Sequence, residues 1–217
     1  MGTDQLTIPE TTGLPPSHLT GETRKVNEFI FETIRPYLKG RVLEIGSGLD
    51  TVSSLLIENG IALHLGETNG KIREILHEKF DNNPTVHSIH KIDFHRTNFE
   101  QAYTNLLGVF NVVFNLNIFN PPIDTLAVSN AKLLLKNKGF LIVLTPVLTS
   151  TYNDLSVDLK ELKKYNRKDI SSLLGEGFEI QKTSYFNLPK IENNTSYSQT
   201  GLSVIVVAQK EELTSTL

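Results

Sequence analysis

Apolar residues recur along this 217-residue chain with two alternating spacings, one typical of helices and one typical of strands. Val26, Ile30 and Ile34 keep the helical spacing, which predicts an amphipathic helix over residues 22–38 that Pro36 kinks or ends. Short apolar runs predict strands at 41–45, 61–65, 85–89, 110–116 and 140–145. The segments between these strands predict helices at 51–59, 71–80, 98–107 and 123–135.

The order of these elements predicts the fold class. Strands separated by helices form βαβ units, so the first five strands predict a parallel sheet in an α/β fold with helices on both faces. A further helix is predicted at 168–174, and two strands follow at 178–186 and 202–209. The link between these two strands is mostly polar, with too few apolar residues for a packed crossover. We therefore expect an antiparallel hairpin at the edge of the sheet.

The two ends of the chain differ from the segment between them. Residues 1–20 are mostly polar, and Pro15 and Pro16 work against a helix, so we expect a flexible N-terminal arm. Residues 211–217 are expected to form a loose tail. A single domain over residues 21–210 is the simplest division, because one α/β domain commonly reaches this length.

Composition narrows the classes of function. Hydrophobic residues make up 39%, and the formal net charge is −3 without a dense run of Lys and Arg, so a packed core is expected and a nucleic-acid partner is not. The chain has no Cys, which excludes disulfides, a Cys-built zinc site and a Cys nucleophile, and no metal is expected. No segment approaches the roughly 20 apolar residues of a membrane span, and no signal peptide is recognised. We expect a cytoplasmic protein whose oligomeric state stays open.

The most informative segment is RVLEIGSGLDT, residues 41–51. An apolar strand carrying Glu44 runs directly into Gly46, Ser47 and Gly48, and a predicted helix follows. In an open α/β sheet, ligands bind at the carboxyl ends of strands, and glycines there allow the backbone to approach a ligand closely. A purely structural turn explains such a glycine pair equally well. The residues at the other strand ends are therefore needed to distinguish a ligand site from a structural turn.

Polar side chains follow the next strands at the same relative place. Glu67, with Thr68 beside it, comes after the second strand, about 20 residues beyond the glycines, which is where a ribose-binding acid is expected. Asp93 follows the third strand and suits an exocyclic adenine amine, and Phe94 suits one face of the adenine ring. Asn115 lies at the end of the fourth strand. Taken alone, Glu67 is equally explained as a solvent-exposed acid at a strand end. Taken alone, Asp93 and Phe94 are explained as a helix cap and an aromatic residue of the core. The placement of all these residues at the carboxyl ends of neighbouring strands is what predicts a nucleoside site.

These motifs resemble those of class I methyltransferases that depend on S-adenosylmethionine (SAM). The segments that carry the resemblance are VLEIGSG at 42–48, FNVVFNLNIFN at 110–120 and LLLKNKGFLIVLTP at 133–146. The resemblance covers roughly residues 22–210. It implies a Rossmann-like sheet of order 3-2-1-4-5-7-6 that ends in an antiparallel pair, and SAM as the cofactor.

A narrower likeness concerns the acceptor. ETIRPYLKGRVLEIGSG, KKYNRKDISSLLGEGFEI and SYFNLP are similar to segments of methyltransferases found beside or fused to polyprenyl-phosphate sugar transferases. This likeness implies a glycan, a lipid-linked sugar or another small molecule as the methyl acceptor. If the acceptor is a hydroxyl or a carboxylate, a base is needed, and His95, Tyr152 and Tyr165 are the candidates.

Two departures from the family pattern keep other hypotheses open. Asp50 stands where the first motif commonly has a third glycine, and Pro121 stands where the fourth-strand motif has a His. A methyltransferase-like binding protein without catalysis is therefore the second hypothesis. A nicotinamide-dependent oxidoreductase is the third, but it requires a glycine at the position of Thr51 and a second dinucleotide-binding half.

Overall fold

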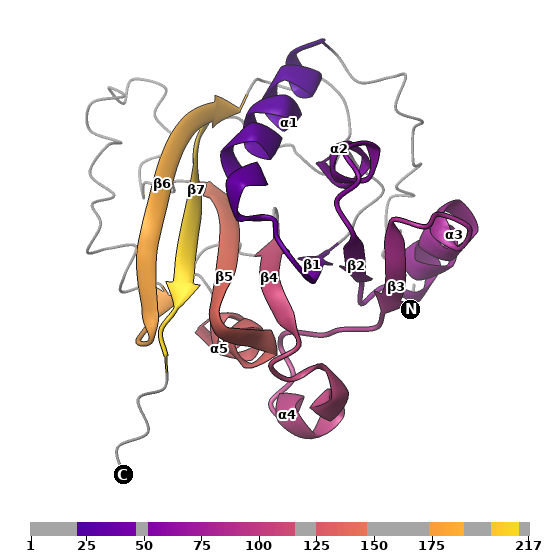
Figure 1. Cartoon of the computed structure of the whole chain (residues 1–217), viewed down its shortest axis with the longest axis vertical. Helices are drawn as coiled ribbons and strands as arrows, with labels where there is room; N and C mark the ends of the chain where they lie inside the picture. The colour runs from indigo at the N-terminus through magenta and orange to yellow at the C-terminus, as the bar shows by residue number, and fades with distance from the viewer. Residues whose placement is uncertain (1–20, 47–51, 116–124, 147–173, 189–200, 213–217) are drawn as a thin grey trace, which may run out of the picture.

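A computed structural model describes residues 21–46, 52–115, 125–146, 174–188 and 201–212, and all structural statements below concern these residues. They form a seven-stranded sheet of order β3-β2-β1-β4-β5-β7-β6 (Figure 1). Its strands are β1 Val42–Ile45, β2 Leu63–Gly66, β3 Val86–His90, β4 Phe110–Asn115, β5 Leu135–Pro146, β6 Phe178–Leu188 and β7 Gly201–Lys210. β1 to β5 pair in parallel, whereas β7 is antiparallel to both β5 and β6. The predicted strand order and the C-terminal antiparallel pair are confirmed.

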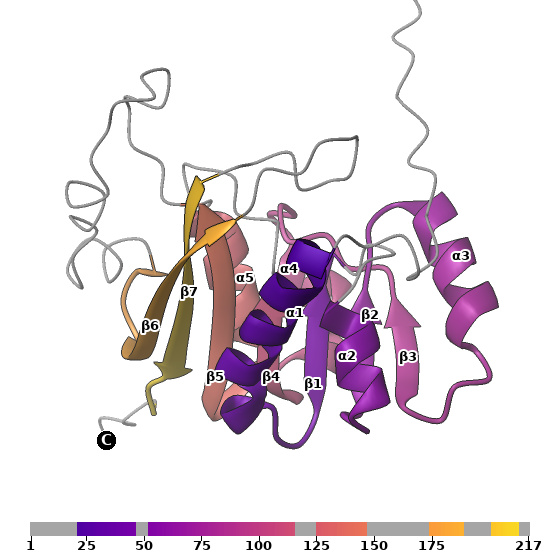
Figure 2. The same ribbon diagram turned by 90° about the horizontal axis from the view of Figure 1, so that it is seen from above.

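Helices cover both faces of the sheet (Figure 2). α1 Gly21–Ile34, α2 Val52–Glu58 and α3 Gly70–Phe80 lie on one side, which we call the α1 face. α4 Phe99–Ala102 and α5 Thr125–Leu134 lie on the other, which we call the α5 face. The division follows from right-handed crossovers, because the strand order runs outward from β1 to β3 and then reverses to β4 and β5, which moves the later helices to the opposite face.

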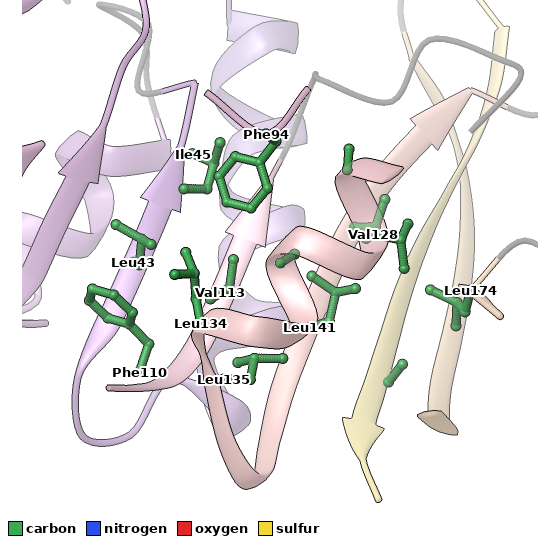
Figure 3. Close-up of a cluster of buried hydrophobic side chains, with 14 of the residues drawn as sticks. Leu43, Ile45, Phe94, Phe110, Val113, Val128, Leu134, Leu135, Leu141 and Leu174 are labelled. Carbon is green, nitrogen blue, oxygen red and sulfur yellow. The ribbon is translucent and has the colours of Figure 1, made fainter. Parts of the chain in front are cut away.

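The two faces have separate apolar cores. On the α5 face, Leu43 and Ile45 of β1 pack with Phe94 and with residues of β4, α5 and β5 (Figure 3). On the α1 face, Val42 packs with residues of the three helices there. Each fully buried apolar side chain contributes about 1.5–3 kcal/mol, so the paired cores hold the strand ends in fixed positions.

Two elements differ from the sequence-based expectation. The helix predicted at 98–107 is divided into α4 and a 3-10 turn, η3 Thr104–Leu106, because Tyr103 adopts a φ of −127°. β5 begins at Leu135, directly after α5, instead of near residue 140. The backbone turns at Lys138, whose φ of 60° is unusual for a residue with a side chain. The helix predicted at 168–174 lies almost entirely outside the described residues.

The first helix ends where the sequence indicates. α1 stops at Ile34, and a 3-10 turn, η2 Arg35–Tyr37, follows with Pro36 inside it. Within the described part of the chain, no helix combines the length and the apolar character that crossing a membrane demands.

A lysine of the last strand closes the carboxyl end of α5. The Nζ of Lys210 donates to the carbonyl oxygens of Lys132 at 2.9 Å and of Leu135 at 2.7 Å. The last carbonyl groups of a helix have no partner inside the helix, so this cation satisfies the carbonyl of Lys132 in the last turn of α5 and that of Leu135 directly after the helix. The contact joins the end of β7 to the end of α5.

Candidate functional site

The candidate site lies where the strand order reverses. The chain runs from β1 outward to β3 and then returns to β4 on the other side of β1. The amide of Gly46 donates to the carbonyl of Gly66 at 2.8 Å, and the amide of Glu67 donates to the carbonyl of His90 at 3.0 Å. The carboxyl ends of β1, β2 and β3 are thus tied side by side along one rim. Ligands of open α/β folds bind at such a reversal point.

Two glycines shape this rim. Gly46 has a φ of 67°, a conformation that side chains with a Cβ rarely adopt. At Gly66, an added Cβ would lie 2.9 Å from Cδ1 of Ile45 and 3.3 Å from the carbonyl oxygen of Glu44, so a side chain there would require the Ile45 side chain to shift. Ser47 and Gly48 lie outside the described residues, and their predicted contact with the cofactor stays a prediction.

Glu44 is buried just below the rim, on the α1 face. Its side chain is 4% exposed, and the hydroxyl of Ser53 in the first turn of α2 donates to its Oε2 at 2.6 Å. Burial raises the pKa of the Glu44 carboxyl to about 7, and the hydrogen bond from Ser53 opposes this shift. Glu44 therefore links β1 to the start of α2 below Gly46.

Glu67 is held by the turn between β2 and α3. Its side chain is 7% exposed, and Oε1 accepts the amide of Asn69 at 2.8 Å. Asn69 also caps α3 by accepting from the amides of its first turn. Nη1 of Arg73 donates to the carbonyl oxygens of Glu67 at 3.0 Å and Thr68 at 2.6 Å. The carboxylate is thus pre-positioned, with Oε2 left to accept from a ligand, and the exposed Thr68 lies beside it.

Asp93 lies at the same rim, beyond β3. Its side chain is 41% exposed, and Oδ1 accepts the amide of His95 at 3.0 Å. The backbone amide of Asp93 donates to the hydroxyl of Tyr103 at 2.8 Å. Phe94 is only 5% exposed and packs against Phe99 at 5.3 Å between ring centroids. Phe94 therefore serves the apolar core, and its predicted contact with an adenine ring stays a prediction.

Two buried asparagines hold the rim segments in place. Nδ2 of Asn115 donates to the carbonyl of Ile45 at 2.7 Å, across the reversal point between β4 and β1. Nδ2 of Asn130 in α5 donates to the carbonyl oxygens of Phe94 at 2.7 Å and Arg96 at 3.0 Å. Asn115 is thus at the predicted place, and its direct partner is the end of β1.

Several supporting residues were not predicted from the sequence: Ser53, Asn69, Arg73, Tyr103 and Asn130. An Asn directly before a helix is a cap signal, so the position of Asn69 was readable. Nothing in the sequence marks Asn130, because its partners lie more than 30 positions away.

Of the three candidate bases, the structure describes only His95. Its side chain is 55% exposed, and Nδ1 lies 3.8 Å from Oδ1 of Asp93 at the rim. Tyr152 and Tyr165 lie outside the described residues, as do Asp50 and Pro121. Among the residues that are described, no three His, Asp or Glu side chains converge in a way that could hold a metal ion.

The fold is similar to that of solved methyltransferases. A SAM-dependent methyltransferase from Methanosarcina mazei matches with a TM-score of 0.59 at 14% identity, covering 82% of this chain and 97% of that one. A structure concerned with conversion of a disulfide bond into a thioacetal group during echinomycin biosynthesis matches with a TM-score of 0.62 at 12% identity, covering 84% and 81%. The trans-methyltransferase CalH in complex with SAH, the demethylated form of SAM, matches with a TM-score of 0.56 at 17% identity, covering 87% and 55%. The amino-acid sequence matches no family model and no curated protein.

Proposed function

Because the chain has the fold of class I SAM-dependent methyltransferases, we propose that it binds SAM and transfers the methyl group to a small molecule or to a glycan or lipid-linked acceptor. One observation carries the proposal: Gly46, Glu67 and Asp93 follow three neighbouring strands along one rim. Bound SAM would supply a methyl group on a sulfonium, and the chain's own residues orient it and exclude water.

Each rim residue has a distinct part in holding the cofactor. Oε2 of Glu67 accepts from the ribose hydroxyls, because Oε1 already accepts from Asn69. The partly exposed carboxylate of Asp93 accepts from the adenine amine. Gly46 brings the backbone close to the cofactor, and Asn115 fixes the end of β1 from which this turn starts. Asn69 and Arg73 hold the Glu67 turn before the ligand arrives, which lowers the entropy lost on binding.

The acceptor class rests on the sequence resemblance. Segments 32–48, 163–180 and 184–189 are similar to methyltransferases associated with polyprenyl-phosphate sugar transferases, which supports a glycan or a lipid-linked sugar. His95 is the candidate base at the rim, and its ring is open to solvent and therefore to an acceptor. Tyr152 and Tyr165 remain candidates on sequence grounds.

Titration calorimetry with SAM, SAH and NAD⁺ tests the cofactor. The wild-type protein should bind SAM and SAH but not NAD⁺. Glu67→Gln should weaken SAH binding about ten-fold or more, because a hydrogen bond from a ribose hydroxyl to a charged group is lost. Glu78→Gln, an equal change on the exposed side of α3, is the matched control and should bind like the wild type. Binding of NAD⁺ without SAH would refute the proposal, and the antiparallel β6–β7 pair speaks against that outcome.

Asp50 and Pro121 favour a second candidate function, a protein that binds the cofactor without transferring its methyl group. Both residues replace family residues near the cofactor tail and the acceptor. Incubation with methyl-labelled SAM and a glycolipid extract distinguishes the two: incorporation of label supports transfer, and tight SAH binding without any incorporation supports the binding protein.

A further inference from the structure

A buried amide on α1 has no hydrogen-bond partner. Asn27 is 5% exposed, and its Nδ2 is the one buried side-chain nitrogen or oxygen of the described residues that lacks a partner. A buried donor without an acceptor destabilises a fold, and such groups are rare in native proteins. A leucine of nearly the same size would remove this cost, so the amide calls for an explanation.

Asn27 continues the apolar stripe of α1. Ile30, Phe31 and Ile34 are all at most 4% exposed and pack into the core of the α1 face. Asn27 precedes them at the i, i+3, i+4, i+7 spacing that places residues on one side of a helix. The amide thus replaces the apolar residue expected at the N-terminal end of this stripe.

The N-terminal end of this apolar stripe, where Asn27 lies, is directed toward the rim formed by the carboxyl ends of the strands. α1 ends near the amino end of β1, to which it is joined through residues 35–41, so its N-terminal half points toward the carboxyl ends of the strands (Figure 2). Asn27 stands about 10 Å up the helix from Ile34. β1 from Val42 to Gly46 spans about 13 Å. Asn27 therefore reaches about the height of the last residues of β1.

The direction in which the proposed cofactor extends indicates which of its groups could accept a hydrogen bond from Nδ2 of Asn27. The proposed nucleoside contacts, Glu67 and Asp93, lie on the β2 and β3 side of Gly46. The amino-acid end of the same molecule must then extend to the opposite side, toward β4. α1 lies on that side of α2 (Figures 1 and 2). Of the two charged groups at that end, only the carboxylate accepts hydrogen bonds.

We propose that Asn27 is a cofactor-binding residue whose Nδ2 donates to the carboxylate of the amino-acid end of SAM. This inference rests on the proposed function. It accounts for an amide that is unpaired in the protein alone, because the ligand completes its hydrogen bonds. It also extends the site from the strand ends to the helix that covers them.

A double-mutant-type cycle, which combines one protein variant with one altered ligand, tests the hydrogen bond between Asn27 and the carboxylate. SAM and decarboxylated SAM, which lacks only the carboxylate, are titrated by calorimetry into the wild type and into Asn27→Leu. The variant should lose about ten-fold or more in affinity for SAM and nothing for decarboxylated SAM, because the affected contact is absent from the second ligand. Thr33→Val, at another buried polar position of α1, is the control and should bind both ligands like the wild type.

The protein without ligand provides a second readout. Asn27→Leu should unfold at a urea concentration equal to or above that of the wild type, since an unpaired buried amide is replaced by an apolar group. Asn27→Asp keeps the shape and places a negative charge near the carboxylate, so it should weaken SAM more than decarboxylated SAM. An equal loss for both ligands, or no loss for SAM, overturns the inference while the proposed function stands. A wild type that binds neither ligand overturns both.

Discussion

Replacing Glu44 by Gln isolates the effect of a buried ionisable group beneath the rim. Glu44 is 4% exposed and accepts the Ser53 hydroxyl at 2.6 Å. Glutamine has the same length and an oxygen that can accept this bond, but it carries no charge at any pH. The substitution therefore tests whether burial disfavours the ionised carboxylate, as a pKa raised from 4.5 to about 7 requires.

The magnitude follows from this pKa difference. A rise from 4.5 to about 7 is about 2.5 units, which corresponds to about 3 kcal/mol at 1.36 kcal/mol per unit. The folded protein holds the proton more tightly than the unfolded chain does, so this stabilising contribution is complete below pH 4.5 and is lost as the pH rises through 7. The wild type should thus lose stability relative to Glu44→Gln between pH 5 and pH 8.

Urea unfolding of the ligand-free protein, followed by circular dichroism, measures the difference. The free energy of unfolding of Glu44→Gln relative to the wild type should increase by about 2–3 kcal/mol from pH 5 to pH 8. Glu78→Gln, on the exposed side of α3, should show a difference that does not change with pH. If the Glu44→Gln difference is also constant, or if the variant becomes relatively weaker at pH 8, the carboxylate is stabilised in its charged form and the reasoning is wrong.

Three further substitutions test the supports of the fold and the site. Asn130→Ala should lower the free energy of unfolding by about 1–3 kcal/mol in urea and weaken SAH binding, because the carbonyl oxygens of Phe94 and Arg96 lose their donor. Burial, followed by the neighbouring His90, His87 and Arg41, lowers the pKa of His64 from 6.5 to about 4, so the unfolded chain binds more protons between these values. Wild-type melting temperature should therefore fall as the pH falls from 6.5 to 4, and His64→Gln should flatten that slope; an unchanged slope contradicts the assignment. Lys210→Met should reduce stability in thermal melts more than Lys136→Met, an exposed lysine at the start of β5, because only Lys210 donates to the end of α5.

The strand framework was readable from the sequence because it depends on local patterns. Short apolar runs alternate with helical spacing, and this alternation alone gives parallel strands with helices between them. The division of the predicted 98–107 helix was not readable. The Tyr103 hydroxyl accepts a hydrogen bond from the amide of Asp93. Such a contact between two different elements produces no periodic pattern in the sequence. The early start of β5 likewise follows from pairing of Leu135 with Phe110.

The candidate site likewise contains residues whose positions could be predicted from the sequence and residues whose positions could not. The positions of Glu67 and Asp93 at the rim were predictable because strand ends are predictable and the rim follows from parallel pairing, whereas their contacts with a cofactor stay predictions. The packing of Phe94 against Phe99 was not predictable, because Phe99 comes from a helix whose packing the sequence does not specify, and the contact of Phe94 with an adenine ring stays a prediction. Asn27 carries no motif at all. Its amide is buried without a hydrogen-bond partner, and no pattern of residues along the chain indicates this.

The place of β7 has a consequence for how the chain is completed during synthesis. β7 leaves the ribosome after β5 and β6, yet it lies between them and carries the lysine that closes α5. While residues 201–210 are still inside the exit tunnel, β6 has no neighbour to join, and one edge of β5 is open to other chains. Assembly of this half of the sheet must therefore wait until residues 201–210 have emerged from the tunnel, and until then the open edge of β5 can pair with another molecule.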